Sequence, residues 1–526
     1  MVVQKKESTQ LGNGHVSDTE SQNVWTISDV NRVEKIYTYN EALELAGHGL
    51  YNIGLLFTLI LGMHALAMEI FGFSIVVRGA TCDFKLHQSQ KSILLAMPYL
   101  GSIFMSYPWG YIADTQGRRR GLIIALWGSF IAAVVSAFSV NWITLAVLKF
   151  ISSSFSSGIQ SLAYTLLGES CAERYKNRYL VILTSSLMTS FCIYMVYGFF
   201  VLRLTFSLDM GLITFTPWRL LTLILASPLG ATLLLVSLFH ESPKYLLNAG
   251  FHDKALGILK KIHRTNGKCN YEYSVKKIVV NETGAKIRNV DVSLMKSLKD
   301  QTVPLFKPPI LYRTLQLFYL TVVIYSPSNG LISWLPFLAE SFSTNWGSSS
   351  SNNETQDFCS MIVTSQNVQE VAGVESCLSS INIESVWISL IHGISFTTAC
   401  LIMAMVANRK RMLLIVIFIV SGGSGLISVN VTDKIASIIF FFGMILDCLG
   451  IAIVFSYFVD LYPTSYRGMA SCLGVMVARA AAVAGVSLIG KYMFSHCTES
   501  MFVWSIIILS GVVASIFLPP DKIEKE

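Results

Sequence analysis

The sequence predicts an all-α polytopic membrane protein with twelve transmembrane helices in two sets of six. Of its 526 residues, 53% are hydrophobic and 13% charged, and the mean hydropathy is +0.56. This composition excludes an ordinary soluble globule. Apolar stretches of about 20 residues, the length that crosses a bilayer, recur along the chain. Lysine and arginine gather in the segments predicted to lie on one side of the membrane.

The apolar stretches place the twelve helices and so divide the chain. Six are predicted near residues 49–77, 91–112, 121–140, 142–168, 179–203 and 219–240, and six more near 313–338, 385–407, 412–431, 434–459, 468–490 and 500–518. The domains are an N-terminal tail (1–48), a first bundle (49–240), a connecting loop (241–312), a second bundle (313–518, with an outer loop at 340–384) and a short tail (519–526). In the connecting loop, residues 254–262 carry apolar side chains at helical spacing, which predicts a short helix.

Positive charge predicts the orientation. Residues 241–313 contain fourteen Lys or Arg, whereas residues 340–384 contain none and carry six acids. Because short cytoplasmic loops retain positive charge, the first segment is expected to be cytoplasmic and the second extracellular or luminal. Residues 1–48 are polar and contain no signal peptide, so both termini are expected in the cytoplasm. The net charge of +7 then reflects topology, and no nucleic-acid partner is expected.

The cysteines and one sequon predict covalent features of the outer side. None of the ten cysteines lies in a C-x-x-C pair, so neither a metal site nor a cofactor is expected. Cys359 and Cys377 share the outer loop and are the candidate disulfide, with Cys82 and Cys497 on the same side as competing partners. Asn353 begins an Asn-Glu-Thr sequon in that loop and is the candidate glycosylation site.

A short basic loop follows the second predicted helix. It reads Gly110-Tyr-Ile-Ala-Asp114-Thr-Gln-Gly117-Arg118-Arg119-Arg120-Gly121. Its length and charge indicate a tight hairpin on the cytoplasmic side. An offset of 291 residues relates this region to the second half: it carries Arg118 to Arg409, Glu169 to Asp460, Lys176 to Arg467, and Asp114 to Met405. Two six-helix repeats joined by a long loop are typical of transporters that work by alternating access.

The G-x-x-x-D-x-x-G-R-R pattern of this loop resembles the signature of the major facilitator superfamily. The segment Glu241-Ser-Pro-Lys-Tyr-Leu-Leu247 and the segment from Asp460 to Gly468 resemble those of sugar porters, organic cation transporters and synaptic vesicle glycoprotein 2 relatives. The long loop between helices seven and eight is similar to that of the last group. The resemblance implies the major facilitator fold, with helices one and four lining the cavity of the first bundle.

The chain departs from that group at two places. Lys149 replaces an arginine in the run from residue 149 to 158, where serines and a phenylalanine replace most of the glycines. The group's first helix carries two acids three residues apart, whereas here Glu69 has Leu66 in place of its partner. Local packing is therefore expected to differ, and a role that requires two carboxylates is not expected.

Glu69 and Lys149 are predicted to face each other. An acid within a span needs a partner, a water-filled cavity or a proton, and the two residues lie at nearly the same depth from the outer ends of helices one and four. The pair is a candidate proton switch or substrate site, and the alternative is a static ion pair that fixes packing. His64, one turn earlier, is a further candidate, with a packing role as its alternative.

The same depth estimate pairs Asp447 of helix ten with Arg479 of helix eleven. A structural pair is the first interpretation, and an arginine that faces substrate is the second. The aromatic residues Tyr164, Tyr194, Tyr325 and Trp334 are candidates for the cavity wall, although most aromatics in such a chain face lipid or core.

Charged residues at the cytoplasmic helix ends are candidate gates. The resemblance implies that they pair across the two halves when this side closes, and the alternative is that they only determine topology. These residues are Asp114, Arg118, Glu169, Lys176, Asp460 and Arg467.

Together these features predict a secondary active transporter for a small organic solute, cationic or derived from an amino acid, with protons as the candidate coupling ion. It is expected to be a monomer in the lipid bilayer of the plasma membrane or an intracellular vesicle. The alternative is a non-transporting vesicle-membrane regulator or receptor of the synaptic vesicle glycoprotein 2 type. No nucleophile motif, phosphate loop or metal cluster indicates an enzyme.

Overall fold

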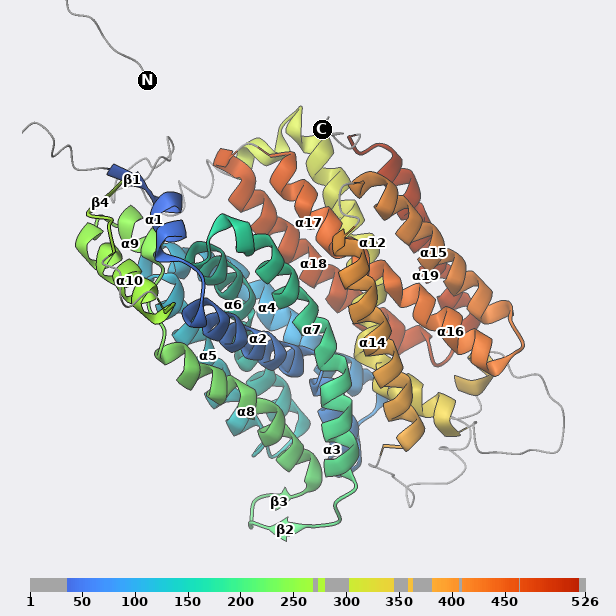
Figure 1. Ribbon diagram of the computed structural model, residues 1–526. Coiled ribbons are helices and arrows are strands. Elements are labelled where there is room, and N and C mark those ends of the chain that lie inside the picture. Colours follow the sequence, from blue (N-terminus) through green and yellow to red (C-terminus); the bar gives the residue numbers. More distant parts are fainter. Residues whose placement is uncertain are drawn as a thin grey trace, which may run out of the picture.

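The computed structural model describes residues 36–267, 273–279, 302–344, 358–362, 381–405, 409–462 and 464–519. Two helical bundles lie side by side in Figure 1, the first half of the chain in blue to green and the second half in yellow to red. The predicted all-α architecture of two bundles is confirmed.

The first bundle contains six spanning segments. They are α2 (Leu50–Ile70) with its continuation α3 (Phe73–Phe84), α4 (Gln88–Gln116), α5 (Arg118–Ser136), α6 (Trp142–Ser170), α7 (Glu173–Leu202) and α8 (Pro217–Ser237). Between α7 and α8, the short strands β2 (Leu208–Asp209) and β3 (Thr214–Phe215) pair antiparallel.

The second bundle also contains six spanning segments within the described residues. They are α12 (Ile310–Thr344), α14 (Ile383–Met405), α15 (Lys410–Asn430), the segment made by α16 (Lys434–Ile445), η3 (Leu446–Leu449) and α17 (Gly450–Asp460), then α18 (Thr464–Tyr492) and α19 (Cys497–Ile516). The twelve segments agree with the predicted number, and several run a few residues beyond the predicted ends.

A small module packs against one end of the first bundle (Figure 1). It comprises β1 (Ile36–Thr38), α1 (Tyr39–Ala46), α9 (Pro243–Asn248), α10 (His252–Thr265) and β4 (Lys277–Val279), and the short η1 (Val303–Phe306) leads into α12. Strands β1 and β4 pair in parallel. Helix α10 contains the segment in which the sequence predicted a helix. We call the end that carries α9 and α10 the connector side, and the end that carries β2, β3 and residues 358–362 the loop side.

Helices α4 and α7 are less apolar than the other spans because they lie at the contact between the halves. Ten helical segments of the described residues are apolar enough to span a membrane by composition, and α4 and α7 are not among them. Helix α4 packs against α18, and α7 packs against α14, so these two helices carry much of the contact between the bundles. Their polar residues are therefore turned partly away from lipid, which relaxes the requirement for a continuous apolar run.

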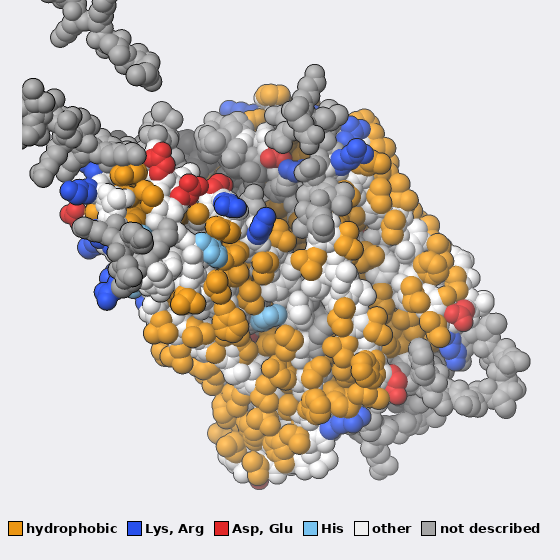
Figure 2. Space-filling model, in the orientation of Figure 1, with side chains coloured by type: hydrophobic (Ala, Val, Ile, Leu, Met, Phe, Trp, Pro, Cys, Tyr) orange, Lys and Arg blue, Asp and Glu red, His pale blue; other side chains and the backbone are white. Residues whose placement is uncertain are grey.

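The surface has the distribution that a bilayer requires. On the face shown in Figure 2, hydrophobic side chains cover the middle of the helices, and charged side chains gather toward the two ends. Exposed apolar residues such as Phe57, Trp127, Ile391 and Ile506 lie on helix faces that turn away from the bundles. Such a band would be unstable in water and is stable in lipid.

Two spanning segments are interrupted, which the predicted spans did not include. The first breaks at Phe71–Gly72, where a Cβ on Gly72 would lie 2.6 Å from the carbonyl oxygen of Met68. It then continues as α3 to Phe84, beyond the predicted end at residue 77. The tenth changes to the 3-10 helix η3 at Asp447. Both interruptions lie beside candidate functional residues, where irregular backbone is common in transporters.

Candidate functional site

Glu69 and Lys149 are in contact, as the sequence predicted. The Lys149 Nζ lies 2.6 Å from Glu69 Oε1, and the two side chains are 6% and 5% exposed. Glu69 comes from the end of α2, just before the break at Gly72, and Lys149 from the second turn of α6. Because an isolated charge at this depth would be costly, each residue makes the burial of the other tolerable.

The surroundings of this pair are polar and tight. The Ser152 hydroxyl donates to Glu69 Oε1 at 2.5 Å, and the Lys149 ammonium lies 4.5 Å from the centre of the Phe73 ring. Met68, Phe73 and Val76 are among the residues that line a cavity of about 10 Å³ beside the pair. A cavity of this size has room for about one water molecule. In this conformation the cavity does not have room for an organic solute.

The serines of α6 replace glycines of the resembling group, and the structure shows what compensates. Phe155 lies directly over Gly128 of α5, where a Cβ would be 2.3 Å from the ring. Ser153 and Ser154 donate hydrogen bonds to carbonyl oxygens one turn earlier in α6, and Gly101 of α4 packs closely on that turn. Small residues on the neighbouring helices α4 and α5 thus allow close packing against α6.

His64 does not extend the Glu69–Lys149 site. Its Nδ1 lies 2.5 Å from the hydroxyl of Ser190 on α7, and the ring is half-buried. This hydrogen bond holds α2 against α7, which is the packing role that the sequence left as the alternative.

The predicted pair between Asp447 and Arg479 is not formed, which corrects the sequence prediction. Asp447 is fully buried and, apart from the neighbouring amide of Cys448, its oxygens have no hydrogen-bond partner in the described part of the chain. Arg479 is half-buried, and its Nη2 donates at 3.3 Å to Gln160 on α6 of the other half. Equal depth in the bilayer did not imply contact because η3 changes the helical phase at Asp447, which moves its side chain round the helix axis.

A polar stripe on α6 leads away from Arg479 toward the connector side. Ser157, Gln160, Ser161, Tyr164 and Thr165 follow one another at helical spacing, and all are half-buried or exposed. The hydroxyls of Ser157, Ser161 and Thr165 donate to carbonyl oxygens of α6 itself. Gln160 contacts Arg479 of the second half, so this part of the stripe faces the region between the halves. Sequence reasoning identified Tyr164 alone from this stripe.

The four candidate aromatic residues divide between two roles. The Tyr164 hydroxyl lies 3.0 Å from Thr184 on α7, and Tyr325 of α12 is half-buried near Arg479. Tyr194 and Trp334 are almost fully buried, and the Trp334 indole donates to the carbonyl oxygen of Val486. Tyr164 and Tyr325 therefore lie on the half-buried surface, whereas Tyr194 and Trp334 belong to the packed interior.

The charges of the first basic loop pair within the first half. Arg118 Nε lies 3.0 Å from Glu169 Oε2 on α6, and Arg118 Nη2 lies 3.4 Å from Asp114. The hydroxyl of Ser242 donates to Glu169 Oε2 at 2.5 Å. Glu241 accepts from the amides of Arg119 and Arg120 at the start of α5, where a carboxylate is favoured by the unpaired amides.

The second half contains a matching pair. Lys410 Nζ lies 2.8 Å from Asp460 on α17, so α15 and α17 are joined as α5 and α6 are. The 291-residue offset thus locates the acid, while the base is Lys410, one residue after the predicted Arg409. Lys176 pairs at 3.4 Å with Glu173 in its own helix. Arg467 belongs to α18, and its side chain lies outside the described residues.

Among the described residues, the ion pair that joins the halves lies on the loop side, where the sequence suggested no charge pair. Arg78 of α3 pairs with Glu340 of α12 and also donates at 3.2 Å to the carbonyl oxygen of Pro336. Nearby, the Tyr99 hydroxyl lies 2.9 Å from Ser333, and Gln88 donates at 3.2 Å to the carbonyl oxygen of Gly490. The sequence predicted that the first span ends at residue 77, which placed Arg78 just outside the membrane. Arg78 was therefore not expected to be a buried charge.

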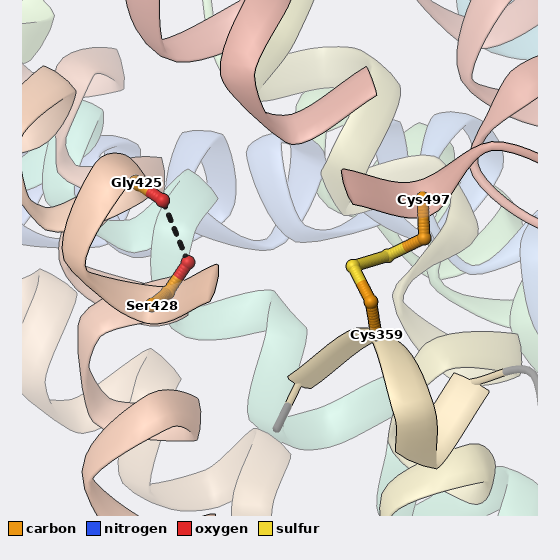
Figure 3. The surroundings of a disulfide bond; sticks show 4 residues. All are labelled: Cys359, Gly425, Ser428 and Cys497. Carbon is orange, nitrogen blue, oxygen red and sulfur yellow. Dashed lines mark hydrogen bonds between the residues drawn. A yellow bond between two sulfur atoms is a disulfide. The ribbon is translucent and has the colours of Figure 1, made fainter. Parts of the chain in front are cut away.

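The loop side is also crosslinked, but not as predicted. Cys359 forms its disulfide with Cys497 at the start of α19, with the two Cα atoms 5.6 Å apart (Figure 3). The same segment is held by aromatic packing, since Phe358, the preceding residue, stacks on Phe441 of α16 at 4.8 Å. Cys82 is disulfide-bonded as well. Cys377 and Asn353 lie outside the described residues, so the glycosylation site stays a prediction.

Twelve spanning segments in two bundles, with polar side chains between them, define a multi-pass membrane protein with the architecture of a transporter. The family model of the Major Facilitator Superfamily matches residues 57–486. The chain belongs to the Major Facilitator Superfamily.

Relatives agree with the resemblance seen in the motifs. The chain is similar to synaptic vesicle glycoprotein 2A from Rattus norvegicus, with 28% identity over 245 residues, which are 45% of this chain and 32% of the relative. It is also similar to organic cation/carnitine transporter 7 from Arabidopsis thaliana, with 28% identity over 232 residues and 44% of each chain covered. The matched region thus spans about a third to under half of the length of these relatives.

Solved structures share the fold. The xylose transporter XylE from E. coli in its inward open conformation matches with a TM-score of 0.62 and 14% identity, covering 90% of this chain and 98% of that chain. Its partially occluded inward open conformation matches with a TM-score of 0.61 and 15% identity, covering 90% and 100%. At this level of identity the likeness concerns the fold alone.

Proposed function

We propose that the protein is a secondary active transporter that moves a small organic solute by alternating access. The observation that carries this proposal is the unequal contact between the halves among the residues that the structure describes. On the loop side an ion pair and hydrogen bonds join them, whereas the charge pairs of the connector side, Arg118–Glu169 and Lys410–Asp460, each stay within one half. The half-buried polar stripe of α6 is then open toward the connector side.

In the proposed orientation, the connector side and both termini face the cytoplasm, so this conformation would face inward. The transition to the outward-facing state would break the loop-side contacts and bring together the connector ends of the two halves. Charges that now pair within each half, such as Arg118 and Asp460, lie at the helix ends that would meet. The predicted gate residues would therefore pair across the halves in the outward-facing state, and not in this inward-facing conformation.

Proton coupling is assigned to Glu69 and Lys149. Their ion pair at 2.6 Å neutralises two buried charges, and the adjacent cavity has room for about one water molecule. A proton on Glu69 would leave Lys149 as an unpaired buried cation, so protonation favours a different arrangement of α2 and α6. The break at Phe71–Gly72 lies directly after Glu69 and supplies a hinge for that change.

Uptake of a metabolite mixture into vesicles that contain the purified protein tests the proposal. We expect at least one small organic solute to accumulate when a proton gradient is imposed, and the gradient dependence to disappear in Glu69→Gln. Glu499→Gln, which removes an exposed acid at the start of α19, is the matched control and should behave as wild type. Accumulation in Glu69→Gln that still follows the gradient would refute the coupling role.

The second candidate function is a vesicle-membrane regulator that does not transport. The observation in its favour is the similarity of 45% of the chain to synaptic vesicle glycoprotein 2A. Membership of the superfamily and the separated connector-side charges favour a transporter, and the superfamily also argues against an enzyme. If no solute accumulates with or without a gradient, while the protein remains folded in the vesicles, the regulator is the better assignment.

A further inference from the structure

Arg479 is a positive charge near the middle of the membrane that no acid neutralises. It lies midway along α18, and no ion pair joins it to a carboxylate among the described residues. Its one hydrogen bond, to Gln160 Oε1 at 3.3 Å, is long and engages only Nη2. A guanidinium has five N–H donors, so most of its capacity is unused.

The buried basic side chains of the described spans each have a carboxylate or carbonyl partner. Lys149 pairs with Glu69, Arg78 pairs with Glu340, and Arg219 donates at 2.8 Å to the carbonyl oxygens of Ala137 and Ser139. Asp447, the acid predicted to neutralise Arg479, does not contact it. Because an unpaired charge in a membrane span is costly, an unsatisfied one that persists indicates a functional role.

Tyrosines of two facing helices lie within the electrostatic reach of the guanidinium. The charge of Arg479 acts on the hydroxyls of Tyr99 on α4 and Tyr325 on α12, and Tyr325 is in turn close to Tyr164 on α6. Gln160, the partner of Arg479, lies one turn before Tyr164 on α6, and the Tyr164 hydroxyl lies 3.0 Å from Thr184. Phenol hydroxyls and an amide both donate hydrogen bonds to anionic oxygens, and the tyrosine rings offer apolar faces beside them.

The polar stripe of α6 offers a route to this cluster. Gln160 and Tyr164 belong to that stripe, which continues through Ser161 and Thr165 toward the connector side. A solute that entered from there would reach Arg479 where the two halves meet. The cluster contains residues of both halves, which is the position at which a transporter must bind its substrate.

We propose that Arg479, Gln160 and Tyr325 bind the carboxylate of a small organic monoanion, and that the transported solute carries this group. A carboxylate accepts two parallel hydrogen bonds from a guanidinium, which neutral and cationic solutes cannot do. Only one uncompensated cation is present among the described residues of the cluster, so a single negative charge fits better than a phosphate dianion. This inference depends on the proposed transport function and replaces the organic cation expected from the sequence.

Thermal unfolding of the purified full-length protein in detergent tests binding without transport. The probes share one carbon skeleton and differ in charge: phenylacetate, phenylacetamide and phenethylamine, and the shorter set of butyrate, butyramide and butylamine. We expect at least one of the two acids to raise Tm at millimolar concentration, and the amides and amines not to. Phenyl phosphate tests whether the site binds any anion instead of a carboxylate. A larger rise in Tm with phenyl phosphate than with phenylacetate would overturn the carboxylate assignment.

Three variants identify the site. Arg479→Gln should reduce the Tm shift caused by the acid at least tenfold, and Arg479→Lys should retain part of that shift. Gln160→Ala should reduce the Tm shift without removing the charge. Arg409→Gln, which removes an exposed positive charge before α15, is the control and should respond as wild type. Gel filtration and circular dichroism confirm that each variant is folded, and Gln160→Ala tests the site if Arg479→Gln does not fold.

The outcomes separate this inference from the transport proposal. An acid that binds through Arg479, while no solute of the mixture is taken up by the vesicles, supports the carboxylate site and refutes the transport proposal. An amine that is taken up equally by wild type and Arg479→Gln supports transport and overturns the inference. Failure of both acids to shift Tm also overturns it.

Discussion

Arg78 of α3 and Glu340 of α12 form an ion pair that joins the two halves of the protein on the loop side. Their side chains are 8% and 12% exposed, and Arg78 also binds the carbonyl oxygen of Pro336. α3 is the second part of an interrupted span, so its position depends on the break that follows Glu69. The loop-side contact and the buried pair Glu69–Lys149 are therefore joined by one short helix.

Neutralising Glu340 should open the loop side. Glu340→Gln leaves Arg78 with a weaker partner and removes the charge attraction between the halves. Ser333, now 3% exposed and bonded to Tyr99, would become accessible. We expect Ser333→Cys to react several-fold faster with an impermeant maleimide applied from the loop side when Glu340→Gln is also present. Equal rates, or the same increase with Glu499→Gln, would show that the ion pair does not hold the halves together.

The Glu69–Lys149 pair should show strong energetic coupling. Lys149→Met leaves a buried carboxylate without its cation, and Glu69→Leu leaves a buried cation, so each change is expected to cost about 3–5 kcal/mol. The double variant Glu69→Leu/Lys149→Met removes both charges and should recover most of that loss. Unfolding of all four proteins in detergent measures the coupling. If the single losses simply add in the double variant, the two residues do not stabilise each other.

Two glycines of the first basic loop should differ sharply on replacement by alanine. Gly117 has φ of +103°, and a Cβ would lie 2.5 Å from Glu241 Oε2, which is held by the amides of Arg119 and Arg120. Gly117→Ala is therefore expected to cost about 1–3 kcal/mol.

Gly110 is the matched control for that change, because a Cβ there would meet nothing within 4 Å. Gly110→Ala, in the interior of α4, should leave the unfolding temperature unchanged or raise it slightly, since alanine favours a helix. A loss of stability from Gly110→Ala equal to that from Gly117→Ala would mean that the left-handed backbone at Gly117 is not the cause.

The disulfide of Cys359 should join the outer loop to α19. Proteolysis without reductant is expected to give a peptide that contains both Cys359 and Cys497, and Cys497→Ser should release Cys359 as a free thiol. Loss of the bond should lower stability by about 2–5 kcal/mol. A peptide that links Cys359 to Cys377 instead would restore the pairing favoured by the sequence.

The architecture was predictable because the bilayer imposes strong and local constraints. Hydrophobic length determined the number of spans, and the offset repeat located Asp460 as the counterpart of Glu169. Glu69 and Lys149 were found together because each is a charge in a span, which is costly unless a partner is near. These signals are carried by individual residues and need no knowledge of packing.

The rest depended on geometry that no local signal carries. The break at Gly72 extends the first span and buries Arg78, and the change to 3-10 helix at Asp447 turns that acid away from Arg479. Counting the charges in the spans could identify Glu69, Lys149, Asp447 and Arg479 as candidates. It could not predict how each helix is rotated about its axis. Likewise, the disulfide partner of Cys359 followed from the stacking of Phe358 on Phe441, which joins distant parts of the chain.

The sequence by itself determined that this protein crosses the membrane twelve times as two related bundles, because the length and polarity of each span are local properties. Only the tertiary structure decided which charges meet: Arg78 with Glu340 across the halves, Arg118 with Glu169 within one half, and Arg479 with no acid of the described residues. Ion pairs form between side chains brought together by helix rotation and bundle contact, and those depend on the whole chain at once.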